Sequence, residues 1–291
     1  MRVIPKLFDS HTHFNFNAFK DDWQEAIKRS LDAGVWFINV GAESKTSKRA
    51  LEISLKYEEG VYASVGLHPI HTYNDELEET IKGETVKFIT KAEDYDEKFY
   101  TSLLENNDKI KAIGEIGLDY FHIKKFPEIL NSELKEKQKK VFSEQLDLAI
   151  KFQKPVILHC RPDKSYDAYW ELLKILDTKD SLLPNPGIIH CFLGNTELLN
   201  EFLKRGFYIG FNGIITFVPD YSELVKQTPL DRIVLETDSP WLAPVPYRGK
   251  RNESLYVAEV AKKIAEIKEE NLSEVKKITT ENALKVFNIK N

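Results

Sequence analysis

Short runs of β-branched and aliphatic residues alternate with longer amphipathic segments along the whole chain. The short runs predict eight strands, at residues 3–8, 35–40, 61–65, 110–116, 155–159, 187–190, 207–211 and 232–236. The segments between them have apolar residues at helical spacing. They predict helices that include residues 21–33, 47–58, 132–152, 195–204, 257–267 and 273–287.

This order of elements predicts a (β/α)8 barrel, the TIM-barrel form of the α/β class. The strands are continuously apolar, which is typical of a parallel sheet covered on its outer face. Eight strand–helix repeats in 291 residues fit one barrel, so we expect a single domain spanning 1–291. An open doubly wound sheet is the main alternative, but no Gly-rich phosphate fingerprint follows any strand.

Residues 74–108 form an acidic insert that is longer and more polar than a βα connection needs. We interpret it as an elaborated third βα segment that is partly helical. Residues 75–108 hold 11 acidic and 4 basic residues, a local charge of −7, so the rest of the chain carries +2 of the total of −5. The net acidity therefore belongs to one segment and does not argue against a phosphate substrate.

The composition predicts an ordinary globular protein, with 42% hydrophobic and 30% charged residues. The two cysteines, Cys160 and Cys191, each follow a histidine directly, so we expect no structural disulfide and a reducing cytoplasm. The first residues lack the pattern of a signal peptide, and no apolar run approaches the ~20 residues of a membrane span. We therefore expect a cytoplasmic protein.

Five short motifs at predicted strand ends carry metal-ligand side chains. They supply four histidines and two carboxylates: His11, His13, Glu115, His159, His190 and Asp238. A βα unit takes roughly 30 residues, so the spacings place these side chains on strands one, four, five, six and eight. All lie at carboxyl ends, where barrel active sites are built. Such a set can bind one or two divalent ions and activate a water.

The motifs individually leave alternatives open. His11 and His13 lie two apart on one strand and point to the same side, which suits two ligands of one ion but also two satisfied core histidines. Glu115 could bridge two cations or form a structural ion pair with a lysine or arginine. Asp238 could be a ligand, a general base or both.

Two carboxylates and two cysteines lie close to these candidate ligands in the sequence, and we do not expect any of them to bind metal. Asp9 and Glu236 are in phase with His11 and Asp238, and we expect them to orient the ligands rather than bind metal. Cys160 and Cys191 are adjacent to strand histidines and therefore point to the opposite face. We interpret both as small buried hydrophobes rather than thiolate ligands.

The same motifs resemble those of the TatD-like metal-dependent hydrolases, a deoxyribonuclease and hydrolase family within the amidohydrolase-type barrels. The resemblance covers essentially the whole chain. It lies in residues 8–13 (FDSHTH), 65–69 (VGLHP), 113–120 (IGEIGLDY), 138–142, 155–161 (PVILHCR), 189–194 (IHCFLG), 235–240 (LETDSP), 248–253 (RGKRNE) and 280–283 (TENA).

The resemblance implies a pair of divalent ions bridged by Glu115. One ion would be bound by His11, His13 and Asp238, and the other by His159 and His190. It further implies substrate contacts for three residues, His68, Arg161 and Arg248. Two segments depart from the family pattern: the acidic insert after His68, and a somewhat long loop at residues 121–132.

The resulting prediction is a divalent-metal-dependent hydrolase, a TatD-like deoxyribonuclease that cleaves phosphodiester bonds from a strand end. Glu115 and Asp238 would be catalytic. The metal would be Mg, Mn or Zn, with mixed imidazole and carboxylate ligands favouring Mn or Zn. DNA with single-stranded or frayed ends would be the partner, and no membrane or obligate protein partner is expected.

The surroundings of the predicted rim support a nucleic acid substrate modestly. Basic residues follow the motif strands: Arg161, Lys164, Arg248, Lys250 and Arg251. Tyr166, Trp241 and Tyr247 could stack on bases of a single strand. One alternative is hydrolysis of an amide, lactone or phosphotriester at the same centre. Another is a non-catalytic barrel, which would be expected to lack ligands, whereas all six candidates are present.

Overall fold

Eight parallel strands form one sheet in the computed structural model, which describes residues 4–81, 84–163, 165–179, 182–183 and 185–290. Their order is β1 (Leu7–Thr12), β2 (Val35–Val40), β3 (Val61–Val65), β6 (Ile110–Asp119), β7 (Val156–Arg161), β8 (Gly187–Ile189), β9 (Tyr208–Phe211) and β10 (Ile233–Leu235). Each strand is hydrogen-bonded to the next in parallel register. The predicted parallel sheet is confirmed.

The first and last strands meet at their carboxyl ends and nearly close the sheet into a barrel. Thr12 and Ser239 form a parallel bridge. The His13 amide donates to the Ser239 carbonyl and the Asp238 amide to the His11 carbonyl, each at 2.9 Å. The predicted (β/α)8 barrel is therefore confirmed, and two of the predicted site segments form its seam.

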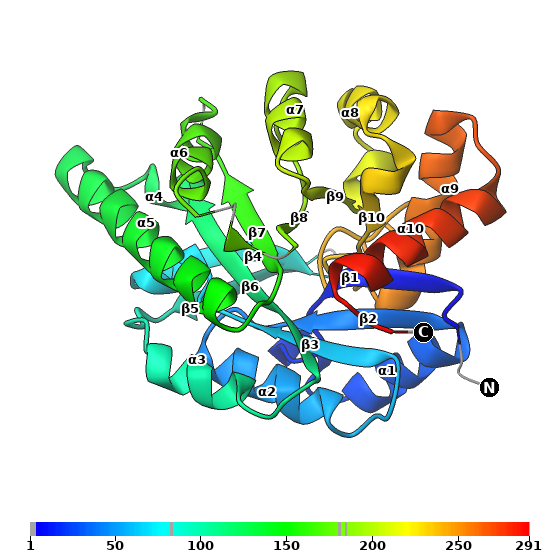
Figure 1. The fold of residues 1–291 in the computed structure, drawn as a ribbon, viewed down its shortest axis with the longest axis horizontal. Helices are drawn as coiled ribbons and strands as arrows, with labels where there is room; N and C mark the ends of the chain where they lie inside the picture. The colour runs from blue at the N-terminus through cyan, green and yellow to red at the C-terminus, as the bar shows by residue number, and fades with distance from the viewer. Residues whose placement is uncertain (1–3, 82–83, 164, 180–181, 184, 291) are drawn as a thin grey trace.

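Helices follow the strands and surround the sheet. They are α1 (Trp23–Asp32), α2 (Ser44–Ser54), α3 (Glu97–Leu104), α4 (Tyr120–Ile123), α5 (Glu128–Lys151), α6 (Asp167–Leu176), α7 (Thr196–Lys204), α8 (Ser222–Gln227), α9 (Val257–Lys268) and α10 (Leu272–Val286). In Figure 1, α1–α3 lie on one side of the strands and α5–α9 on the other. Short 3-10 turns occupy several connections, among them Pro69–Thr72 after β3 and Gly213–Thr216 after β9.

An apolar cluster fills the inside of the barrel. All eight strands contribute at least one buried side chain to it, through Phe8, Trp36, Ile38, Val40, Tyr62, Ala112, Ile157, Ile188, Tyr208 and Val234. Side chains that meet from every strand can only do so in the interior. Leu284 and Phe287, at the end of α10, belong to the same cluster. A larger cluster packs the outer face of the sheet against the helices, and it contains Cys160.

Two predicted boundaries are wrong around the site. The first strand was expected at 3–8 but spans Leu7–Thr12, because the polar side chains at its end are buried and hydrogen-bonded like the rest of the strand. Residues 121–132 were expected to form a long loop, but α4 ends at Ile123 and α5 begins at Glu128.

The acidic insert contains an element that the sequence analysis missed. Strands β4 (Asp75–Ile81) and β5 (Glu84–Thr90) pair in antiparallel register. The expected helical part is present as α3, which begins after an Asp96 cap. Lys125, between α4 and α5, lies 2.7 Å from the Asp75 carboxylate and ties the hairpin to the rim beyond β6.

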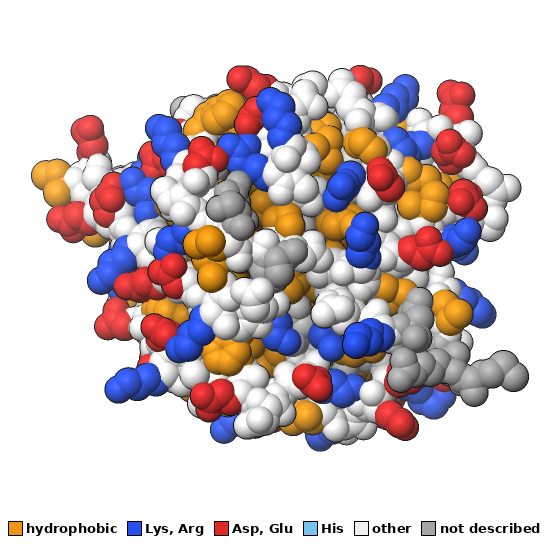
Figure 2. Space-filling view, in the orientation of Figure 1, with side chains coloured by type: hydrophobic (Ala, Val, Ile, Leu, Met, Phe, Trp, Pro, Cys, Tyr) orange, Lys and Arg blue, Asp and Glu red, His pale blue; other side chains and the backbone are white. Residues whose placement is uncertain are grey.

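Charged side chains of both signs are interspersed on the surface. Figure 2 shows acidic and basic groups alternating across the visible face, without a large area of one sign. Many are paired locally, as are Lys28 with Asp32 and Lys262 with Glu259.

Among the described residues, no helix is both long and apolar enough to cross a membrane.

Candidate metal centre

The predicted site residues lie directly above the apolar interior of the barrel. Side chains two apart on a strand point the same way. His159 follows Ile157 at this spacing and His190 follows Ile188, so each imidazole continues a column that begins in the core. The polar layer thus rests on a packed layer of apolar side chains, which restricts its rotamers.

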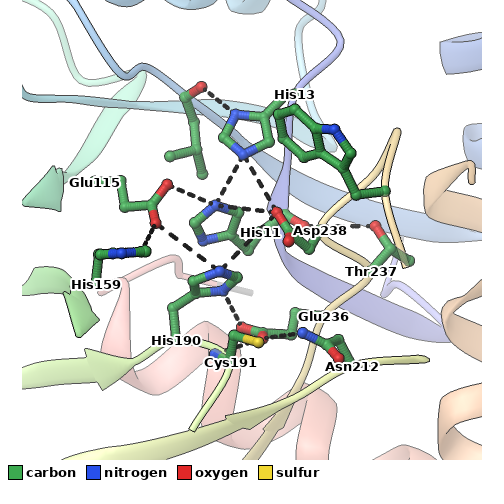
Figure 3. A network of polar contacts seen from close by, with 12 residues as sticks. His11, His13, Glu115, His159, His190, Cys191, Asn212, Glu236, Thr237 and Asp238 are labelled. Carbon is green, nitrogen blue, oxygen red and sulfur yellow. Dashed lines mark hydrogen bonds and ion pairs between the residues drawn. The ribbon is translucent and has the colours of Figure 1, made fainter. Parts of the chain in front are cut away.

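His11, His13, Glu115 and Asp238 converge on one point from three parts of the barrel, as Figure 3 shows. The Nε2 atoms of His11 and His13 are 3.0 Å apart. Glu115 Oε2 lies 3.3 Å from His11 Nε2, and Asp238 Oδ1 lies 3.5 Å from His13 Nε2. The His13 ring contacts the Val40 carbonyl through Nδ1 at 2.9 Å, which leaves Nε2 for the centre.

Glu115 is placed between two groups of histidines. The β6–β7 register shifts between Ile113 and Ile116, so Glu115 leaves the regular ladder and its amide donates instead to the Gly41 carbonyl at 3.0 Å. Its second oxygen, Oε1, lies 2.8 Å from His159 Nδ1 and 3.9 Å from His190 Nε2. One carboxylate therefore faces both predicted ligand sets.

His68 joins the second group more closely than expected. Its Nε2 atom lies 3.4 Å from Glu115 Oε1, and its ring meets that of His159 edge-on with centroids 4.2 Å apart. The sequence analysis gave His68 only a substrate contact. The distance of His68 from Glu115 lies within the 2.8–3.9 Å range of the ligand candidates His11, His159 and His190, and it is one of three residues that could bind a metal ion together.

Glu236 is positioned to orient His190. Its Oε2 atom lies 2.9 Å from His190 Nδ1, at an angle poorer than that of a good hydrogen bond, and its Oε1 accepts the Cys191 amide at 2.8 Å. The carboxylate fits against β9 because residue 210 is glycine: a Cβ there would overlap Glu236 Oε2. The contact lies on the far side of the ring from the centre.

Asp9 fixes the loop that carries Asp238. Its carboxylate is fully buried and accepts the Thr237 amide at 2.9 Å and the Thr237 hydroxyl at 2.7 Å. Burial raises the pKa of Asp9 to about 7 despite these hydrogen bonds. Asp238 itself has φ of 55°, in the left-handed region that non-glycine residues rarely adopt. The Asp9–Thr237 contacts stabilise the segment directly before it.

Asp119, at the end of β6, is a residue of this network that the sequence analysis did not identify. It is fully buried, and its Oδ2 atom lies 3.1 Å from His159 Nε2 and 2.8 Å from His122 Nδ1. A carboxylate on the second nitrogen of a ligand imidazole fixes its orientation. Asp119 lies in the motif IGEIGLDY, but only the pairing of β6 with β7 reveals its contact with His159.

The charges of the cluster compensate one another. Burial opposes ionisation of Glu115, but His68 and His11 outweigh it and hold the pKa of this carboxyl well below its usual range. The pKa of Asp238 is lowered against burial in the same way, mainly by His13. Burial also opposes charge on His159 and His190, yet nearby carboxylates raise their pKa values to about 9 and about 10. Both imidazoles are cationic at neutral pH without metal.

These donor atoms fit a divalent ion. Atoms bound to one ion at ~2.0–2.2 Å lie roughly 3–3.5 Å from one another in tetrahedral or octahedral geometry. The contacts among His11, His13, Glu115 and Asp238 run from 3.0 to 3.9 Å. Two imidazole nitrogens that face each other at 3.0 Å cannot both be protonated without repulsion. A cation held by these two imidazoles and the two carboxylates would satisfy all four groups.

The three arginines expected near the substrate differ in the partners that their guanidinium groups already contact. Arg161, at the end of β7, lies with its guanidinium 4.0 Å from the Phe121 ring. Arg248 donates to the Ala243 carbonyl at 3.0 Å and stacks on Phe217. Arg251 was expected to support an anionic substrate, but it forms ion pairs with Asp22 and Glu253, so its charge is already matched.

The other expected rim residues are placed as follows. Lys164 lies outside the described residues. Lys250 lies 5.7 Å from the centre of the Tyr247 ring, and this ring stacks on Tyr256. Tyr166 is exposed. Trp241 is next to the centre, with its ring 5.3 Å from that of His13.

Cys160 occupies the position expected for it, but the expectation for Cys191 is wrong: Cys191 is only partly buried and lies beyond the end of β8, where its amide donates to Glu236. Cys160 is buried in the cluster between the sheet and the helices. Cys191 follows His190 and takes part in none of the groups of described residues that could bind metal. Burial raises the pKa of both thiols well above the usual value, so neither is a ready thiolate.

A barrel that carries imidazoles and carboxylates in this arrangement at its carboxyl end belongs to the class of metal-dependent hydrolases. Within that class, residues 8–288 match the family described as TatD related DNase. The chain is a member of this TatD family of metal-dependent hydrolases.

Relatives of similar length support this assignment. The chain is 37% identical over 286 residues to the uncharacterized metal-dependent hydrolase YabD of Bacillus subtilis, covering 97% of this chain and 99% of the relative. It is 30% identical to the uncharacterized metal-dependent hydrolase MJ1582 of Methanocaldococcus jannaschii, covering 97% of each. The crystal structure of YjjV, a TatD homolog from Escherichia coli, is 28% identical, with a TM-score of 0.81 over 99% of this chain and 100% of that one.

Proposed function

We propose that this protein is a deoxyribonuclease that hydrolyses phosphodiester bonds from a strand end, using two divalent ions. The observation that carries the proposal is the position of Glu115. Its two oxygens face two groups of imidazoles, 3.3 Å from His11 on one side and 2.8 Å from His159 on the other. A single carboxylate shared in this way is suited to bridge two cations.

The donors divide into two sets around Glu115. His11, His13 and Asp238 would bind one ion, and His159 and His190 the other, with His68 close to the second set. When bound, a pair of divalent ions polarises a phosphoryl group and activates a water for in-line attack. The imidazole content favours zinc or manganese over magnesium.

Asp238 would accept a proton from the attacking water. Its Oδ1 atom faces the imidazoles of His13 and His190, at 3.5 and 4.0 Å. In the described part of the chain no hydrogen-bond or ion-pair partner contacts Oδ2, and the side chain is 16% exposed. Because the pKa of Asp238 is lowered, the carboxylate is ionised at neutral pH and can take up a proton at Oδ2.

The rim favours an anionic, base-bearing substrate. The guanidinium of Arg161 has no carboxylate partner among the described residues. Phe16 and Trp241 lie beside His13, and their rings meet edge-on at 5.7 Å. Aromatic faces next to a phosphate-binding centre can stack on the bases of a single strand. The family description as TatD related DNase agrees with this substrate class.

We further propose that all 291 residues form one catalytic barrel domain, which acts on DNA in the cytoplasm without an obligate protein partner. Hydrolysis of a lactone, an amide or a phosphotriester is the second candidate, because the same donor set serves these reactions. Arg161 favours the diester, since the alternatives carry no negative charge at the reacting group.

The test is a metal-resolved nuclease assay on single strands labelled at the 3′ or 5′ end. A phosphotriester and a lactone serve as control substrates, and each metal is added to chelator-treated protein. We expect stepwise shortening from one end, with little turnover of the controls. Strong turnover of a control without cleavage of DNA would reject the deoxyribonuclease.

A further inference from the structure

His122 is held at the rim by the buried carboxylate that also contacts the metal centre. Asp119 Oδ1 accepts the His122 amide at 3.0 Å, while Oδ2 contacts His122 Nδ1 at 2.8 Å and His159 Nε2 at 3.1 Å. Because the two imidazoles share one oxygen, the position of His122 relative to His159 is fixed. Asp119 is therefore a positioning residue for both.

The free edge of the His122 ring is available to a ligand. The side chain is 19% exposed and belongs to α4, which begins directly at the carboxyl end of β6. Substrates of barrel enzymes enter at this end of the strands. Asp119 occupies Nδ1, and no partner contacts Nε2 in the described parts of the chain. Nε2 is the one polar ring atom left to meet a substrate.

Two cationic side chains gather with His122 around the same aromatic ring. Phe121 lies edge-on to the His122 ring, with centroids 5.3 Å apart. The Arg161 guanidinium is 4.0 Å from the Phe121 ring centre and the Lys124 ammonium 3.6 Å. Asp163, 3.8 Å from Lys124, offsets part of this charge. The strand pairing supports the grouping, since Asp119 and Arg161 are register partners on β6 and β7.

We propose that His122, positioned by Asp119 and flanked by Arg161, binds the phosphate that neighbours the scissile one in a polynucleotide substrate. The inference rests on the proposed function and deepens it, because it makes the preferred substrate a chain with at least two phosphates. In this arrangement the Nδ1 edge of the His122 ring stays on the Asp119 carboxylate and its Nε2 edge meets a phosphate oxygen. No bond other than hydrogen bonds forms or breaks.

The experiment compares two substrates that differ by one nucleotide and therefore by one phosphate. The dinucleoside monophosphate dTpdT contains the scissile phosphate alone, whereas the trinucleotide dTpdTpdT contains a neighbour as well. For the metal-loaded parent we expect kcat/KM to be at least about tenfold higher on the trinucleotide, the usual effect of a charge-assisted hydrogen bond. His122→Ala should bring this ratio close to one, because any change that reaches His159 through the shared Asp119 carboxylate acts on both substrates and cancels in the ratio.

Two further variants separate binding from folding. His122→Gln keeps a donor near the Nε2 position and should retain part of the preference, so it also serves if the alanine variant fails to fold. Lys262→Gln removes an exposed cation on α9 that pairs with Glu259, and it should leave the ratio unchanged. An unchanged ratio in both His122 variants, with both substrates still cleaved, would overturn the inference alone. Failure of the parent to cleave either substrate would instead overturn the proposed deoxyribonuclease.

Discussion

Replacing Glu115 with glutamine is the perturbation that most sharply tests the role of a bridging carboxylate. The amide preserves the volume and one oxygen, but it removes the charge that lies between the two imidazole groups. Glu115 Oε1 is 2.8 Å from His159 Nδ1, and Oε2 is 3.3 Å from His11 Nε2. Glu115→Gln should therefore weaken both proposed ion sites at once, whereas changing a histidine should affect one.

The size of the effect follows from these distances. At 2.8 Å and an effective dielectric constant of about 20, a pair of unit charges interacts by about 6 kcal/mol before desolvation is subtracted. Removing one preorganised electrostatic group from an active site costs ~3–4 kcal/mol of transition-state stabilisation. We therefore expect kcat/KM on a single-stranded oligonucleotide to fall by about 10²–10³, and the bound metal to fall from two ions per chain towards one.

The assay combines metal analysis by mass spectrometry with steady-state cleavage of a labelled strand. Glu274→Gln, an exposed carboxyl in the first turn of α10, is the matched control and should behave like the parent. Circular dichroism establishes that both variants are folded. If Glu115→Gln retained two ions per chain and the activity of the parent, Glu115 would not be the bridge.

Further predictions concern the charge state and support of the centre. Metal binding at pH 7.5 should release about two protons per chain, because His159 and His190 have pKa values near 9 and 10 without metal. Calorimetry in buffers of different ionisation enthalpy measures the number of protons released, and a release of none would contradict the prediction. These pKa values lie above the value of about 6.5 that a histidine has in the unfolded chain. The contribution of the two charged imidazoles to the free energy of unfolding is therefore complete below about pH 6.5 and is lost as the pH rises through 9–10. The Tm of chelator-treated protein should accordingly fall between pH 7 and pH 10, and a constant Tm would argue against cationic imidazoles. Glu236→Gln should weaken metal binding by ~10–100-fold in a chelator competition, because it frees the His190 ring; unchanged affinity would show that Glu236 does not orient His190.

The barrel and the ligand candidates could be predicted from the sequence because both depend on local patterns. A strand buried on both faces is a continuous apolar run, and a ligand at its end stands out as a polar interruption. The convergence of His11, Glu115 and His190 then follows from the regular geometry of a barrel. The structure brings these side chains together as expected.

The features that could not be predicted from the sequence depend on contacts between residues that are far apart in the chain. The end of β1 was missed because Asp9 is buried and satisfied by Thr237, 228 positions later. Arg251 was expected at the rim, yet Asp22 matches its charge. The contact of Asp119 with His159 requires the register of two strands. The β4–β5 hairpin was hidden because its acidic composition resembles that of a solvated loop.

The central claim is that Glu115 joins two ion sites that together perform hydrolysis. Its most direct test is to titrate metal into chelator-treated protein while following the cleavage of a single-stranded oligonucleotide. The account predicts no activity without metal, little with one equivalent per chain, and full activity at two equivalents. Full activity in the presence of chelator, or a maximum already at one equivalent, would contradict it.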